Sequence, residues 1–177
     1  MEAKKIIIHK DYKINKIKRG KNWEHDLALI MLKKSLDSTY MPACLAPKLE
    51  DYTGKKAYLY GWGAIADTKL GPGCRGSGSW VSPVLRMTTQ TIISNRECKK
   101  SAGLIYMCDP KTNTTVPGRA KYEGKIFGDM ICGVNSGRGQ CQGDGGGPFT
   151  VEENGQHILV GVTSWSIGCA KVNMCLI

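Results

Sequence analysis

The segment whose residue types most strongly suggest chemistry is CQGDGGGPF, residues 141–149. Closely spaced glycines expose backbone N–H groups, and such a loop can cradle phosphate when it leads from a strand into the N-terminus of a helix. Here a short apolar run, residues 148–151, follows the glycines and is typical of another strand. We therefore do not expect a phosphate site in this loop.

The elements that position this segment are expected to be short strands. The chain has 177 residues with 22 Gly and 7 Pro, and its apolar runs are short, which indicates a turn-rich β protein with one core. No run approaches the ~20 residues needed to cross a bilayer, so we expect no membrane span. The predicted strands are residues 4–12, 27–32, 57–62, 84–93, 130–134, 148–151 and 156–165.

Hydrophobic periodicity adds detail to these strands. Residues 27–32 are continuously apolar, which predicts a strand buried on both faces. Along residues 84–93, the odd-numbered positions predict a single half-buried face. Ser94 and Glu97 are typical of a capping box that opens a short helix through Lys100. The expected loops are residues 13–21, 35–51, 67–79 and 108–128.

Several motifs resemble one protein family. Residues 141–149 are similar to the CQGDSGGPL nucleophile motif of the trypsin-like serine proteases. Further matches occur in that family's order: HDLALI at 25–30 resembles its aspartate motif, YGWG at 60–63 its GWG turn, MICG at 130–133 its MICAG segment, and TSW at 163–165 with GCA at 168–170 its SWG..GCA wall. The resemblance covers most of the chain, which is identified on this basis as a member of the family.

The resemblance implies an all-β fold of two six-stranded antiparallel barrels with the active site between them. We expect residues 1–40 to be a remnant of the first barrel, with about two strands, and residues 41–56 to connect the barrels. Residues 57–177 would form the second barrel, ending before the family's last strand and C-terminal helix. An incomplete first barrel would expose strand edges and apolar faces, which favours association with a partner.

Family chemistry uses a serine nucleophile, a histidine base and an aspartate that orients the histidine. Asp26 matches the aspartate, although a solvated Asp before a strand would look the same. The nucleophile position holds Gly145, which has no side chain. The family's histidine motif lies upstream of the aspartate, and no segment of this chain matches it. The resemblance therefore implies a peptidase homologue that is catalytically inactive.

The three histidines of the chain are not expected to replace that base, because a general base needs hydrogen-bond geometry before a suitable pKa. His9 lies in a segment resembling the family's IIHPDY strand end, where the role is structural. His25 adjoins Asp26, and strand alternation would point the two side chains to opposite faces. His157 lies at an expected turn before a strand.

Other parts of the family's site persist by resemblance. The N–H groups of Gly143 and Gly145 match the oxyanion hole, which needs no side chain. The specificity pocket would have Gly139 at its base, where trypsin-like enzymes that hold Lys or Arg carry Asp. Arg138 lies beside it, so basic substrate side chains should not be preferred.

The wall that pairs with substrate backbone would be Ser164, Trp165 and Ser166, with Ser166 where the family usually has Gly. Asp144 matches the residue that pairs with a new N-terminal ammonium when a zymogen is cut. Residue 1 follows that cleavage site in the family's order, so Asp144 is expected to lack this partner, which is costly for a buried carboxylate. These positions imply a remnant cleft for a peptide or protein ligand.

The eight cysteines favour an extracellular protein. The resemblance pairs Cys98 with Cys132 and Cys141 with Cys169, and it leaves Cys44 for a disulfide to an upstream segment. Another family disulfide would join positions 57 and 151, which here hold Ala and Val. The pairing of Cys44, Cys74, Cys108 and Cys175 stays open.

Asn113 begins a glycosylation sequon, as in surface loops of secreted proteins. Residues 1–10 do not resemble a secretory signal, which suggests that a leading segment precedes this chain. A longer secreted endopeptidase containing this chain is the alternative interpretation.

The net charge of +10 makes a polyanion such as heparin a plausible partner. A solvated basic loop is the competing interpretation, and it is favoured because runs of charge are usually solvated. Nucleic acid is disfavoured, because few aromatics accompany the basic residues. No metal site or cofactor is expected. The basic residues that would bind the polyanion are Lys4, Lys5, Lys10, Lys13, Lys16, Lys18, Arg19 and Lys21.

Overall fold

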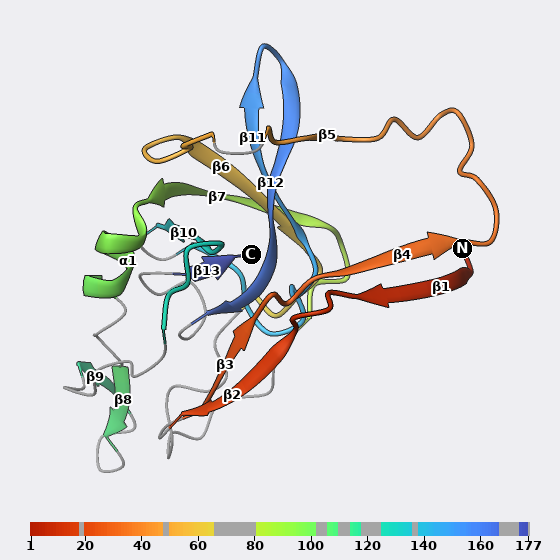
Figure 1. The fold of residues 1–177 in the computed structure, drawn as a ribbon. Helices are drawn as coiled ribbons and strands as arrows, with labels where there is room; N and C mark the ends of the chain where they lie inside the picture. The colour runs from red at the N-terminus through yellow and green to blue at the C-terminus, as the bar shows by residue number, and fades with distance from the viewer. Residues whose placement is uncertain are drawn as a thin grey trace.

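The computed structural model describes residues 1–17, 20–47, 50–65, 81–101, 106–109, 114–117, 125–135, 138–166 and 174–176. In these ranges the chain is a β protein with one short helix, as expected (Figure 1). The elements are β1 (Ala3–Ile8), β2 (Lys13–Ile17), β3 (Gly20–Glu24), β4 (Ala28–Leu32), β5 (Cys44–Leu45), β6 (Lys56–Gly61), β7 (Arg86–Ile93), α1 (Asn95–Ser101), β8 (Tyr106–Asp109), β9 (Thr114–Pro117), β10 (Ile131–Val134), β11 (Pro148–Glu153), β12 (Gln156–Ser166) and β13 (Met174–Leu176).

The largest sheet curls on itself. Its strand order is β11-β6-β7-β10-β13-β12-β5, and β11 also pairs with β12, so six strands close a ring. We expected no strand after β12, but β13 lies between β10 and β12 and pairs antiparallel with both. Without β13 these two strands would leave an open edge, and closure removes that edge.

Within the described ranges, buried side chains form two hydrophobic clusters. One contains Phe149, Val151 and Ala57, which are at most 1% exposed. The other surrounds the disulfide between Cys98 and Cys132. Ala57 and Val151 are direct cross-strand partners of β6 and β11, so the two positions matched to a missing family disulfide face each other. Buried apolar side chains occupy the place of that disulfide.

The predicted buried face of β7 was wrong. Gln90 and Ile92 are each 3% exposed, whereas Leu85 and Met87 are more than half exposed. The even-numbered residues Gln90 and Ile92 therefore face the core, whereas Arg86 at the start of the strand is exposed. Hydrophobic periodicity did not predict this buried face, because one of its central residues, Gln90, is polar. The helix was predicted correctly: Ser94 Oγ accepts a 3.2 Å hydrogen bond from the Glu97 N–H at the start of α1.

The N-terminal strands lie beside the closed sheet rather than inside it (Figure 1). β1 pairs antiparallel with β4 in a two-stranded sheet. β4 was expected to be buried on both faces, but Leu29 is 71% exposed and Ile30 is 62% exposed. A strand is buried on both faces only when other elements cover it, and β1 is the single strand that pairs with β4 within the described ranges.

Two of the predicted loops contain hairpins. The segment 13–21 was expected to be a basic loop, but β2 and β3 form an antiparallel pair with Ile14 opposite Trp23 and Lys13 opposite Glu24. Cross-strand apolar pairs and the hydrogen bond that Asn15 donates to Glu24 stabilise this hairpin despite its many lysines. Within the predicted loop 108–128, β9 pairs with β8. Asn113, between them, lies outside the described residues.

Candidate functional site

The turn that follows Cys141 is held in place by backbone hydrogen bonds. The Asp144 carbonyl accepts a 3.0 Å bond from the Gly147 N–H, and the Gly146 N–H donates a 2.8 Å bond to the Thr163 carbonyl of β12. Gly143 and Gly146 have φ values of +95° and +85°, which L side chains rarely adopt. The spacing of these glycines therefore has a backbone reason independent of any phosphate.

Asp144 is half-buried, and each oxygen of its carboxylate accepts a hydrogen bond from the backbone. Oδ1 accepts a 2.7 Å hydrogen bond from the Gly63 N–H, and Oδ2 accepts a 2.8 Å bond from the Cys141 N–H. Two backbone N–H groups therefore hold a carboxylate that was expected to lack its ammonium partner. A Cβ atom at Gly61 or Gly63 would overlap this carboxylate, which explains why the YGWG motif needs both glycines.

Gly145 is exposed and has room for a side chain. No atom of the described residues lies within 4 Å of the position that its Cβ would occupy, and it is not among the glycines with positive φ. The position matched to the family's nucleophile thus tolerates serine sterically. Within the described part of the chain, no intramolecular hydrogen bond occupies the N–H of Gly143 or Gly145. Both N–H groups can donate to a ligand oxygen.

Asp26 lies between β3 and β4 and reaches the closed sheet. Its Oδ2 accepts a 2.7 Å hydrogen bond from Ser164 Oγ of β12. Both residues are half-buried, so this bond is partly screened from water. The structure thus brings together two of the predicted site residues from opposite ends of the chain.

No histidine of the chain reaches Asp26. His25 Nδ1 lies 2.8 Å from Asp129 Oδ2, and the His25 ring stacks on His9 at 4.8 Å between centroids. His157 Nδ1 lies 3.1 Å from Thr150 Oγ1. His25 and Asp26 do diverge, but through the left-handed φ of +49° at His25 rather than by strand alternation.

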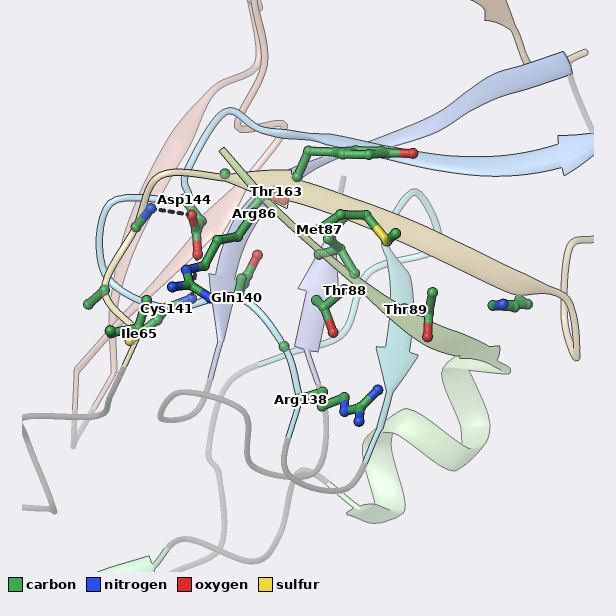
Figure 2. Close-up of a pocket in the computed structure, with 17 residues that line it drawn as sticks. Ile65, Arg86, Met87, Thr88, Thr89, Arg138, Gln140, Cys141, Asp144 and Thr163 are labelled. Atoms are coloured by element: carbon green, nitrogen blue, oxygen red, sulfur yellow. Dashed lines mark hydrogen bonds between the residues drawn. The ribbon is translucent and has the colours of Figure 1, made fainter. Parts of the chain in front are cut away.

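The predicted binding positions separate into two groups. Ser164, Trp165 and Ser166 belong to β12, with Trp165 only 8% exposed. Gly139 instead lines a pocket of about 590 Å³ that none of these three residues lines (Figure 2). Arg138, Cys141 and Asp144, which the sequence analysis singled out, line the same pocket, whereas its lining residues from β6 and β7 were not anticipated.

The structure shows the bonding state of four cysteines, Cys44, Cys98, Cys132 and Cys141. Cys98 and Cys132 form the disulfide that the resemblance implied. Cys141 is disulfide-bonded, whereas Cys169 lies outside the described residues. Cys44 is exposed and free. The part of the chain that the structure describes contains no group of three or more potential metal ligands and no helix long and apolar enough to span a bilayer.

Comparison with known proteins decides the family. The family model described as Trypsin matches residues 1–176. The chain belongs to the trypsin family. Three curated members illustrate its relatives: the chain is 30% identical over 156 residues to serine proteinase stubble of Drosophila melanogaster, 28% over 171 residues to trypsin-1 of Astacus astacus, and 28% over 157 residues to human testisin.

These matches include most of this trypsin family chain but only part of each relative. They cover 86%, 94% and 86% of the chain, and 17%, 57% and 43% of the respective relatives. The chain therefore spans less than two thirds of the length of each.

Proposed function

We propose that this chain is a catalytically inactive member of the trypsin family that binds a peptide segment in a remnant of the active-site cleft. The observation that carries the proposal is Gly145, which supplies no hydroxyl in a place open enough to hold one. Loss of the nucleophile in such a triad lowers turnover on the order of 10⁶-fold, roughly 8 kcal/mol of transition-state stabilisation.

The surroundings of Gly145 support inactivity further. The neighbouring hydroxyl of Ser164 donates to Asp26 and has no imidazole beside it. Asp26 therefore accepts a hydrogen bond from a serine hydroxyl, and no histidine lies beside it to act as a general base. The backbone N–H groups of Gly143 and Gly145 and the half-buried residues Ser164 and Ser166 would supply the binding.

The test is covalent labelling and hydrolysis with the purified, oxidised protein. A serine-directed phosphonate should not label the chain, and peptide amides should not be cleaved above a blank. Gly145→Ser should remain unlabelled, because a restored hydroxyl still lacks a base. Labelling of the parent chain at any residue, or burst kinetics with an ester, would refute inactivity.

The alternative is that a longer secreted endopeptidase contains this chain and supplies the first barrel and a histidine. Only a longer chain carrying Gly145→Ser could then show activity, and the same substitution in the present chain is the matched control. The Cys98–Cys132 disulfide favours an oxidising, extracellular location. Glycosylation at Asn113 and a disulfide from Cys44 to an upstream segment belong to the same proposal.

A second candidate function is polyanion binding by the β2–β3 hairpin. Lys16 and Lys21 are cross-strand partners, and like charges directly opposite one another are destabilising unless an anion lies between them. Neutralising Lys13, Lys16 and Lys21 should shorten salt-sensitive retention on heparin. The same change at Lys99 and Lys100 of α1 should alter retention less. Unchanged retention of the hairpin variant would exclude this surface.

A further inference from the structure

Strand β4 has an edge that no other strand covers within the described ranges. β1 pairs with its opposite edge, and these two strands form a small sheet beside the closed one (Figure 1). Two-stranded sheets are marginally stable alone, whereas three or more strands with an apolar face are more stable. The outer edge of β4 is therefore a place where another strand can add.

The backbone groups of alternate β4 residues point to this outer edge. The His9 N–H donates a 2.9 Å hydrogen bond to the Leu27 carbonyl. Because hydrogen-bonded pairs alternate along antiparallel strands, Leu29 and Met31 also direct their backbone groups toward β1. The intervening residues direct their N–H and C=O groups to the outer edge, where these groups can bond to an added strand. These residues are Ala28, Ile30 and Leu32.

The edges of β1 and β4 differ in their protection against such pairing. β1 carries Lys4 and Lys5, and an extra residue interrupts its register with β4 between Ala3 and Lys5. Lysines and bulges are features that keep an edge strand from pairing with another chain. β4 has the sequence ALIML, with no charge, no proline and no extra residue. Of the two strands, β4 therefore has the edge that is open to pairing.

The side chains along β4 are apolar and exposed on both faces of the small sheet. Leu29 and Ile30 are both more than half exposed, and Met31 is 47% exposed. Successive residues of a strand point to opposite faces, so neither face of β4 is covered. Contact with a partner would remove part of this apolar surface from water.

The charges at the two ends of β4 favour a second copy of the same chain as the partner. Asp26 precedes the strand and Lys34 follows it. In an antiparallel pair of β4 strands centred on Ile30, Asp26 of each copy lies opposite Lys34 of the other. A parallel pair would instead place like charges side by side, which is destabilising.

The same antiparallel register also matches the strands themselves. Ile30 lies opposite Ile30 of the second copy, so residues whose backbone groups point outward face one another. Leu29 then lies opposite Met31, and Ala28 opposite Leu32, which are apolar cross-strand pairs. One surface thus complements itself, as a twofold interface requires.

We propose that two copies of this chain associate through their β4 edges into one four-stranded sheet in the order β1-β4-β4-β1. Growth stops at two copies, because both outer edges of this sheet belong to β1 and carry its lysines and its extra residue. The seam is only five residues long in each copy, so the association is weak and reversible. It does not depend on the inactivity proposed above, which rests on Gly145.

The test is sedimentation equilibrium of the full, oxidised chain over a series of concentrations. The mass should rise from one copy to two and no further. Ile30→Lys sets like charges opposite one another at the centre of the seam and should weaken association at least about tenfold. The matched control is Ile6→Lys. Ile6 is the cross-strand partner of Ile30 and is 60% exposed against 62%, but it lies on β1 away from the seam and should associate like the parent chain.

A mixture of two variants tests the register. Ile30→Lys and Ile30→Glu should each associate poorly alone, and an equimolar mixture should form a mixed dimer because opposite charges then face one another. A mass of one copy for the parent chain at about 1 mM, or association beyond two copies, would overturn the proposal. Equal weakening by Ile6→Lys, or no recovery in the mixture, would also do so.

A disulfide across the seam gives a readout that does not need the charged variants to fold. Ile30→Cys is made together with Cys44→Ser, because Cys44 is exposed and free. Hydrogen-bonded antiparallel partners have Cα atoms about 5.5 Å apart, which is within disulfide range. Oxidation should therefore link two copies. Ile6→Cys in the same background is the control, and linking that is no greater with Ile30→Cys than with Ile6→Cys would contradict the β4 seam.

Discussion

Ser164 donates a 2.7 Å hydrogen bond to Asp26 across 138 residues of sequence. This bond joins the turn before β4 to β12 of the closed sheet. It is a link by which a two-stranded N-terminal sheet, otherwise largely exposed, is tied to the larger one. The aspartate matched to the catalytic triad thus has a structural role that does not depend on catalysis.

Ser164→Ala is expected to lower the free energy of unfolding by about 1.5–3 kcal/mol, because a half-buried carboxylate loses a charge-assisted hydrogen bond. Urea unfolding measures the change. Asp26→Asn combined with Ser164→Ala should cost less than the sum of the single changes. Ser38→Ala, at an exposed position, is the control. A coupling energy of zero between residues 26 and 164 would contradict this role.

Adjacent glycines of the Cys141 turn should respond differently to alanine. At both Gly145 and Gly146 an added methyl group would have no described atom within 4 Å, but only Gly146 has a positive φ, +85°. Gly145→Ala should therefore leave stability unchanged or raise it by up to about 1 kcal/mol. Gly146→Ala should lower it by about 1–2 kcal/mol. Equal effects of the two substitutions in thermal unfolding would show that the turn relaxes.

Replacing Ala57 and Val151 together by cysteine should create a disulfide. The two residues are cross-strand partners in β6 and β11, and antiparallel partners have Cα atoms about 4.5–5.5 Å apart, within disulfide range. Closing this long loop should stabilise the oxidised protein by about 2–4 kcal/mol. Mass change on reduction checks for the bond. Either single cysteine variant is the control and should show no stabilisation dependent on oxidation.

Tyr52 should make stability fall at alkaline pH. Burial, followed by its hydrogen bond to Glu50, raises the pKa of Tyr52 to about 12 from 10.0. Because the folded state holds this proton more tightly, the contribution is complete below pH 10 and is lost as the pH rises through 12. Tyr52→Phe should flatten this part of the stability profile.

Tyr40→Phe is the matched control for that change, since Tyr40 is 61% exposed. Absorbance at alkaline pH should show a tyrosine that ionises near pH 12 in the parent chain and is missing from Tyr52→Phe. An unchanged titration in Tyr52→Phe would contradict the assignment.

The local motifs could be predicted from the sequence because each depends on residues close together in the chain. The glycines of the Cys141 turn, the Ser94–Glu97 cap and the period-two strands each depend on residues a few positions apart. Burial was harder to predict. β4 has the composition of a strand covered on both faces, and only the arrangement of its neighbours shows Leu29 exposed. In β7, the polar Gln90 faces the core where periodicity favoured the opposite side.

The amino-acid order alone determined the family-like motifs, the missing hydroxyl at residue 145 and the lack of any segment that matches the family's histidine motif, because these are properties of residue identity. The tertiary structure decided which distant groups meet. β6 pairs with β7 beside the Arg138–Asp144 segment, and together they line one pocket, while Ser164 of β12 lies against Asp26. Such contacts depend on strand pairing between residues far apart in sequence, which no local spacing encodes.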